Sequence, residues 1–92
     1  MLTPDDLIAL ASIVAYLRKN DVAILRETSE GTLTKFFLKV PDCDGAKHLT
    51  VNRGFLRALT PKQIEEYMEA GDYASKLRQN GDQHLVLYPP SP

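Results

Sequence analysis

The sequence has one cysteine, no tryptophan and no long hydrophobic run. A single cysteine, Cys43, excludes an internal disulfide and a zinc site built from several cysteines, and it is typical of a reducing cytoplasm. No apolar stretch approaches the roughly 18–20 residues that a membrane-spanning helix needs. The start carries Asp5 and Asp6 where a signal peptide would have a basic segment. We therefore expect a cytoplasmic chain that makes no membrane contact.

Charge of one sign does not dominate either. Eleven Lys and Arg residues stand against twelve Asp and Glu residues, so the net charge is −1 and a uniformly basic, histone-like chain is excluded. The hydrophobic share of 43% and the charged share of 25% are ordinary for globular proteins. Ninety-two residues suit one domain. We expect a single α+β domain over residues 1–88, followed by a flexible, proline-rich tail over residues 89–92.

Two segments begin with the same helix-start chemistry. In Thr3-Pro4 and in Thr60-Pro61, a hydroxyl N-cap precedes a proline at the first helical position. The hydrophobic spacing then predicts helices over residues 4–19 and 61–79. A glycine interrupts the apolar stripe of the second helix, and it leaves open either close approach of another backbone or a break at Gly71-Asp72.

Strand signals lie between and after these helices. Two β-prone runs, residues 22–28 and 32–40, flank a short glycine-bearing connection and predict a hairpin. Residues 48–51 and 84–88 predict two further short strands, whereas residues 55–59 are compatible with a helical turn or an extended segment. The predicted fold is two helices packed on a small antiparallel sheet, in the order α-β-β-β-α-β.

The first five of these elements have the order found in the double-stranded-RNA-binding domain, and to that extent the chain resembles this family. The family carries a Lys-Lys-x-Ala-Lys cluster at the start of its second helix, which grips phosphates across a groove. The corresponding stretch here, residues 61–66, has one lysine and two glutamates. The sequence therefore departs from the family at its main phosphate-binding motif, and we do not assign the chain to it.

The first helix is apolar over more than half of its circumference. One stripe contains Leu7, Leu10, Ala11, Val14 and Leu17, and isoleucines flank it on opposite sides. A surface helix needs an apolar arc of only about 100°. One explanation is a helix wedged between the sheet and the second helix, and the other is a subunit interface. We favour a homodimer whose interface includes Leu7, Ile8 and Ile13.

Basic residues are concentrated in the middle of the chain. Residues 32–62 hold six basic and two acidic side chains, a local balance of +4. Alternation along the second strand places Lys35, Phe37 and Lys39 on the face opposite to its apolar side chains. Cations beside an exposed aromatic ring are typical of a nucleic-acid surface, although lysines also protect ordinary exposed strands. The predicted nucleic-acid-binding residues are Lys35, Phe37, Lys39, Arg53 and Arg57.

Other site chemistries find little support. Asp42, Asp44 and His48 lie close in sequence, but an EF-hand would need a bidentate glutamate where the chain has Arg53. Cys43 has no sequence signature of a nucleophile paired with a base, and there is no glycine-rich phosphate loop or dinucleotide motif. We expect no catalytic residues, no metal and no cofactor.

Two function hypotheses follow from these patterns. The first is a small non-enzymatic binding or regulatory module that contacts nucleic acid through a basic β-hairpin face. The second is a homodimeric protein–protein interaction or assembly module with no nucleic-acid role. The partners to be expected are thus a second copy of the chain, a nucleic acid or another protein.

Overall fold

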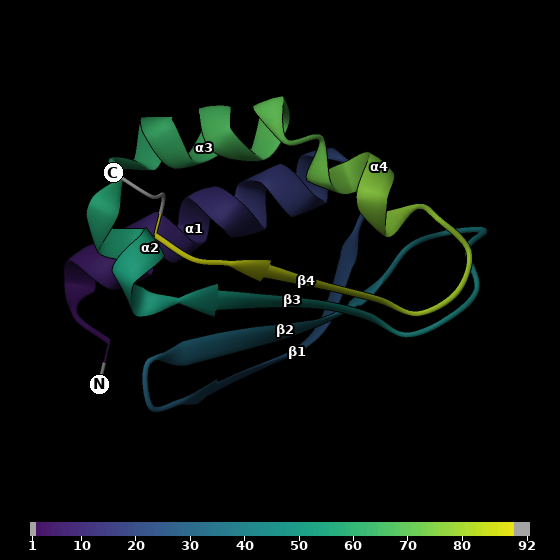
Figure 1. Cartoon of the computed structure of the whole chain (residues 1–92), viewed down its shortest axis with the longest axis horizontal. Coiled ribbons are helices and arrows are strands. Elements are labelled where there is room, and N and C mark those ends of the chain that lie inside the picture. The colour runs from purple at the N-terminus through teal and green to yellow at the C-terminus, as the bar shows by residue number, and fades with distance from the viewer. Residues whose placement is uncertain (1, 90–92) are drawn as a thin grey trace.

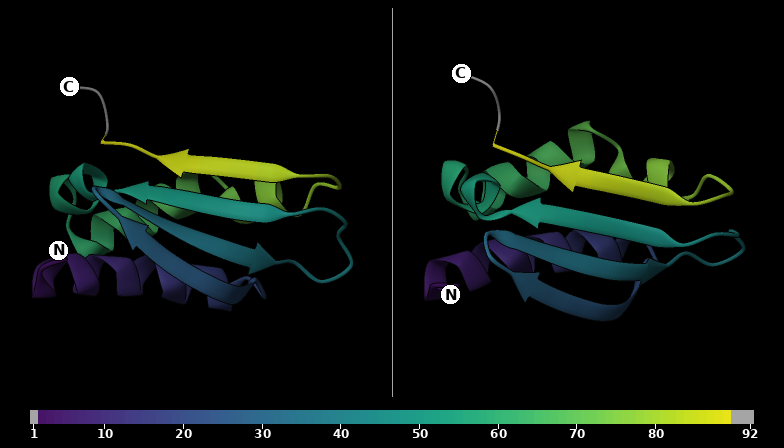
Figure 2. Two further views of the ribbon diagram at one scale, coloured as in Figure 1. Left: turned by 90° about the horizontal axis from the view of Figure 1, so that it is seen from below. Right: turned by 60° about the horizontal axis from the view of Figure 1, so that its bottom comes forward.

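Helices cover one face of a four-stranded sheet in the computed structural model, which describes residues 2–89 (Figures 1 and 2). The predicted α+β class and element order are confirmed. Pro89 follows the last strand, and residues 90–92 of the predicted tail lie outside the described residues. The elements are α1 (Pro4–Lys19), β1 (Ala23–Glu30), β2 (Leu33–Lys39), β3 (Lys47–Asn52), α2 (Arg53–Ala58), α3 (Pro61–Ala70), α4 (Tyr73–Leu77) and β4 (Gln83–Leu87).

The sheet is mixed and has the strand order β1-β2-β3-β4. The first three strands form an antiparallel meander as predicted, but β4 pairs parallel to β3. After β3 the chain crosses the sheet through α2, α3 and α4 and returns to the end where β3 began (Figure 1). A crossover of a dozen or more residues is what a parallel pair requires. The last strand therefore differs from the wholly antiparallel prediction.

Threonine capping boxes start both long helices. The Thr3 hydroxyl accepts a hydrogen bond from the backbone of Asp6, whose carboxylate accepts one from the Thr3 backbone in return. Thr60 and Gln63 repeat this exchange at α3. Each box satisfies two backbone donors that the first helical turn leaves without partners, so local chemistry sets these two starts. The predicted bounds of α1 are confirmed.

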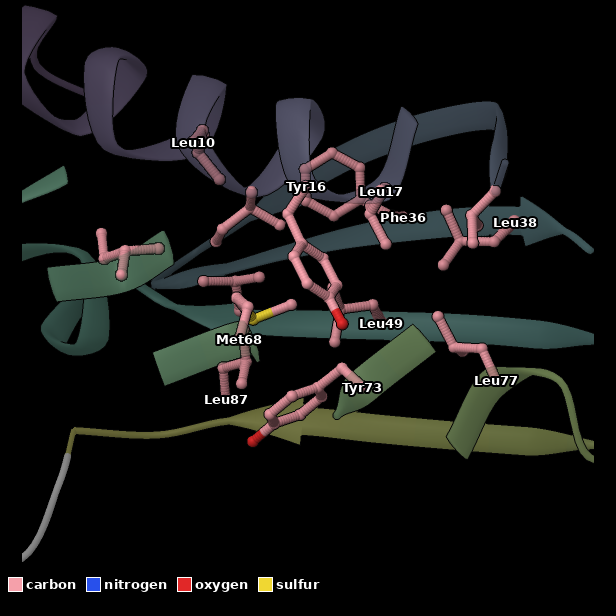
Figure 3. Packing of buried hydrophobic residues seen from close by; sticks show 14 of the residues in the cluster. Leu10, Tyr16, Leu17, Phe36, Leu38, Leu49, Met68, Tyr73, Leu77 and Leu87 are labelled. Atoms are coloured by element: carbon pink, nitrogen blue, oxygen red, sulfur yellow. The ribbon is translucent and has the colours of Figure 1, made fainter. Parts of the chain in front are cut away.

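The second predicted helix is broken, and the open question at Gly71-Asp72 is thereby decided. α3 ends at Ala70, Asp72 takes a left-handed conformation with φ 49°, and α4 begins at Tyr73. A Cβ on Gly71 would lie 2.4 Å from the Tyr73 ring, so glycine makes room for that ring. The break turns Tyr73 and Leu77 into the core (Figure 3).

The core lies between the sheet and the helices. Side chains from α1, β2, β3 and α4 meet there, among them Leu17, Phe36, Leu49 and Leu77 (Figure 3). The Tyr16 ring reaches across this layer, and its hydroxyl accepts a hydrogen bond from the backbone N–H of Ala74 at 3.0 Å. This bond ties α1 to the segment after the helix break.

The buried stripe of α1 is rotated from the predicted one. Ala9, Leu10, Ile13, Tyr16 and Leu17 face the core, and Ile13 has no exposed surface. Ile13 therefore has no accessible surface with which to contact a second copy, and its assignment to a subunit interface is wrong. The other two predicted interface residues, Leu7 and Ile8, are 54% and 56% exposed.

Candidate nucleic-acid interface

The face of the sheet opposite to the helices is uncovered by any element of residues 2–89 (Figure 2). Because side chains alternate along a strand, the residues next to the core positions of each strand face outward here. We call this surface the open face. Among its side chains are Arg26, Thr28 and Glu30 of β1, Leu33, Lys35, Phe37 and Lys39 of β2, His48 and Thr50 of β3, and His84 and Val86 of β4, followed by Tyr88.

Phe37 is the centre of a cluster of cations and rings on the open face. The Arg26 guanidinium lies 4.3 Å from the centroid of the Phe37 ring, and the Lys35 ammonium lies 5.1 Å from it. The His48 ring meets Phe37 edge-on, with centroids 4.9 Å apart. Cations are attracted to the faces of aromatic rings, so this packing holds two positive charges beside one flat apolar surface.

Two histidines extend this cluster across β3 and β4. The rings of His48 and His84 lie 5.8 Å apart, and His84 Nε2 lies 3.0 Å from the hydroxyl of Thr50. The pKa of His48 lies below its usual value, first because burial disfavours the charged ring, and then because Lys35 and His84 add positive charge. His48 is therefore a neutral ring at neutral pH, whereas Lys35 supplies charge.

A groove of about 640 Å³ lies on the open face between the hairpin end and β4. Leu33 and Val86 contribute apolar walls, and Tyr88, which is 60% exposed, stands at its border. All four strands contribute polar side chains to the groove, namely Thr28, Glu30, Lys35, Thr50 and His84, and the turn between β1 and β2 adds Thr32. The groove thus combines apolar walls with hydrogen-bonding groups.

Three of the five predicted nucleic-acid-binding residues come together on this face, namely Lys35, Phe37 and Lys39. Arg57 lies in α2 and forms a two-point ion pair with Asp6 of α1, with N–O distances of 3.2 and 3.1 Å. The grouping of Arg57 with the lysine row is therefore corrected, because helix packing holds Arg57 in the helical layer. Arg53 begins α2 and donates to the carbonyl of Gly31 at 3.1 Å, which places it at the hairpin end of the sheet.

Sequence reasoning missed Arg26, His48, His84 and Tyr88. Period-two alternation along the predicted strands 48–51 and 84–88 would have found the last three. Alternation does not find Arg26, because a bulge between Ile24 and Arg26 shifts the register of β1. Without the bulge, alternation from the core residue Ile24 would have sent Arg26 to the helical side.

A second exposed apolar surface lies on α1. Leu7 and Ile8 are exposed there beside Ala11 and Ala15, and shallow hollows flank this helix face on both sides. One hollow is bounded by Glu27 of β1 and the other by Glu65 of α3. We call these four residues the α1 strip.

The acidic turn before β3 forms no metal centre within the described chain. Over residues 2–89, no group of three or more histidine, cysteine, aspartate or glutamate side chains lies close enough to hold a metal ion. Cys43 instead donates a hydrogen bond to the carbonyl of Arg78 at 2.9 Å. No helix within residues 2–89 has the length and apolar character needed to cross a membrane.

No protein-family model matches the chain, and comparisons with curated proteins and with solved structures found no match.

Proposed function

We propose that this protein is a small, non-enzymatic nucleic-acid-binding module whose contact surface is the open face. The proposal rests on one observation: Arg26 and Lys35 both lie over the ring of Phe37 on a sheet face that no other element of the described chain covers. Nucleic acid offers phosphates and flat bases, and it is bound by cations and aromatic side chains in close proximity.

The charges on the open face fit such a ligand although the whole chain is slightly acidic. Arg26, Lys35 and Lys39 supply three positive charges there, and Glu30 is the one carboxylate among the open-face residues. Each phosphate contact contributes about −0.7 (single strand) to −0.9 (duplex) to the slope of log affinity against log salt. Three contacts predict a slope of about −2 to −3.

The test is a charge reversal on the open face. Lys35→Glu with Lys39→Glu should lower the affinity for a labelled oligonucleotide at least tenfold, measured by fluorescence anisotropy at two salt concentrations. Lys62→Glu with Lys76→Glu is the matched control, because it changes the net charge equally on exposed positions of α3 and α4. Equal loss in both variants, or no loss in the first, would contradict the proposal.

The α1 strip supports a second candidate, a homodimeric assembly module. Leu7 and Ile8 are more than half exposed on a helix whose Ala11 and Ala15 permit close approach of another helix. In an antiparallel pair of α1 helices centred on Ala11, Leu7 of one copy lies opposite Ala15 of the other, and large side chains meet small ones. A dimer is compatible with nucleic-acid binding, because the strip and the open face lie in different layers.

A further inference from the structure

We infer that the nucleic acid is single-stranded and that the groove beside Phe37 holds an unpaired base. The inference rests on the proposed nucleic-acid binding and specifies its ligand. Its basis is the arrangement of the open face, where Lys35 belongs both to the cation cluster on Phe37 and to the groove lining, whereas Arg26 and Lys39 lie outside the groove.

The groove has the walls that a flat base requires. Leu33 and Val86 are apolar, and the Tyr88 ring at the border gives a face on which a base can stack. A groove of about 640 Å³ is within the size range of small-ligand sites. Lys35 also lies 5.1 Å from the centroid of the Phe37 ring, so the groove adjoins the cation cluster and a strand with one base in the groove has its neighbouring phosphate near these cations.

The polar groups in the groove suit the edge of a base. Glu30 offsets the positive charge of Lys35 in the groove lining, and its oxygens can accept hydrogen bonds from the amino groups of cytosine and adenine. Thr50 and His84, bonded to each other at 3.0 Å, offer further hydrogen-bonding atoms. Arg26 and Lys39, which lie outside the groove lining, remain for phosphates together with Lys35 at the junction.

A duplex cannot use this arrangement. Its bases are paired and stacked, so their Watson–Crick edges and flat faces are occupied, and the edges that stay exposed lie inside the grooves of the double helix. No base of a duplex can enter the groove of the protein without first leaving its pair. A single strand can place phosphates on the cations and a base in the groove at the same time. It should therefore bind more tightly than a duplex of the same length.

The experiment compares fluorescence anisotropy of labelled 12-nucleotide strands, as DNA and as RNA, with that of the corresponding 12-base-pair duplexes. We expect one or both single strands to bind at least tenfold more tightly than the duplexes at equal salt. Tyr88→Ala should weaken single-strand binding about tenfold through lost stacking. Tyr88→Phe keeps the ring and is the matched control, which should bind as the unaltered protein does.

A second measurement addresses Glu30. The unaltered protein should bind oligo(C) several-fold more tightly than oligo(T) or oligo(U), because thymine and uracil lack the amino group. Glu30→Gln should reduce that difference, since an amide both donates and accepts.

The outcomes separate this inference from the proposed function. Equal affinity for single strands and duplexes, with no effect of Tyr88→Ala, would overturn the inference while salt-dependent binding through Lys35 and Lys39 remained. No binding of any oligonucleotide at low salt would overturn both.

Discussion

The Asp6 carboxylate is almost completely buried, at 1% exposure, yet it accepts three hydrogen bonds. Two come from the Arg57 guanidinium and one from the Thr3 backbone at the start of α1. Arg57 first, and then the Thr3 backbone, lower the pKa of Asp6 from 3.8 to about 2. Asp6, whose place in the sequence indicates only a helix start, thus also joins α1 to α2. Arg57 stabilises this contact between helices and is not part of the open face.

This ion pair predicts an acid-dependent stability. The folded pKa of Asp6 lies below its unfolded value, so the contribution is fully present above pH about 4 and is lost as the pH falls through about 2. Asp6→Asn should lower the melting temperature at pH 7, and the difference from the unaltered protein should shrink toward pH 2. Thermal unfolding of both proteins, followed by circular dichroism from pH 7 to pH 2, measures this difference in melting temperature. A pH-independent difference would contradict the assignment of the pKa to Asp6.

At the scale of elements, the loop before β3 (residues 40–46) and the loop before β4 (residues 78–82) lie side by side at one end of the sheet. Backbone hydrogen bonds and a buried lysine connect them. Lys47 begins β3, is almost fully buried, and donates to the carbonyls of Gln79 and Gly81 in the loop before β4. Gly81 donates in turn to the carbonyl of Asp44, and Asp82 accepts a hydrogen bond from the Ala46 backbone. These contacts hold β4 beside β3 and therefore place His84 next to His48.

Gly45 is the position where this junction is tightest. A Cβ there would lie 2.3 Å from the backbone carbon of Gly81, whereas a Cβ on Gly81 would meet nothing within 4 Å. Both glycines have positive φ angles, 98° and 93°. Gly81→Ala should therefore cost only the backbone strain, about 1–2 kcal/mol. Gly45→Ala should add about 1–3 kcal/mol of steric overlap to a similar strain.

Urea unfolding of the two variants measures this difference directly. The Gly81→Ala variant is the matched control for backbone conformation in the same pair of loops. Equal losses of unfolding free energy would contradict the close packing of Gly45 against Gly81.

At the scale of the whole molecule, the open face and the α1 strip are two separate surfaces. A dimer through the α1 strip would leave both open faces uncovered. A test of assembly must leave Ile13 unchanged, because Ile13 lies in the core and a charge there would unfold the chain whatever its oligomeric state.

The proposed dimer predicts a mass of twice 10.3 kDa by light scattering. Leu7→Asp with Ile8→Asp should give the mass of one chain without changing the circular dichroism spectrum, because both residues are exposed in a single copy. Leu25→Asp, at another exposed leucine on β1, is the control and should leave the mass unchanged. A single-chain mass for the unaltered protein would rule out the homodimer.

The local parts of the fold were predictable because their causes lie within a few residues. The α1 bounds, the capped start of α3 and the hairpin follow from threonine caps, proline positions and β-prone runs around a glycine. The row of Lys35, Phe37 and Lys39 was predictable for the same reason, since alternation within one strand places all three on one side.

The rest of the candidate site depends on contacts between distant residues. Arg26 reaches Phe37 only because a bulge changes the register of β1, and His84 reaches Thr50 only because β4 pairs in parallel beside β3. The rotation that buries Ile13 and exposes Ile8 is set by packing of α1 against the sheet and α3 together, which helical periodicity alone leaves undetermined.

The sequence by itself therefore determined the α+β class, the order of the elements and the lysine–phenylalanine row, because caps, turns and alternation act over short distances along the chain. The tertiary structure decided which side of α1 is buried and that Arg57 binds Asp6. It also decided that Arg26 and His48 lie against Phe37, with His84 beside His48. These outcomes depend on strand register and on the crossover that returns the chain to β4, and such long-range pairings are chosen by the packing of the whole core.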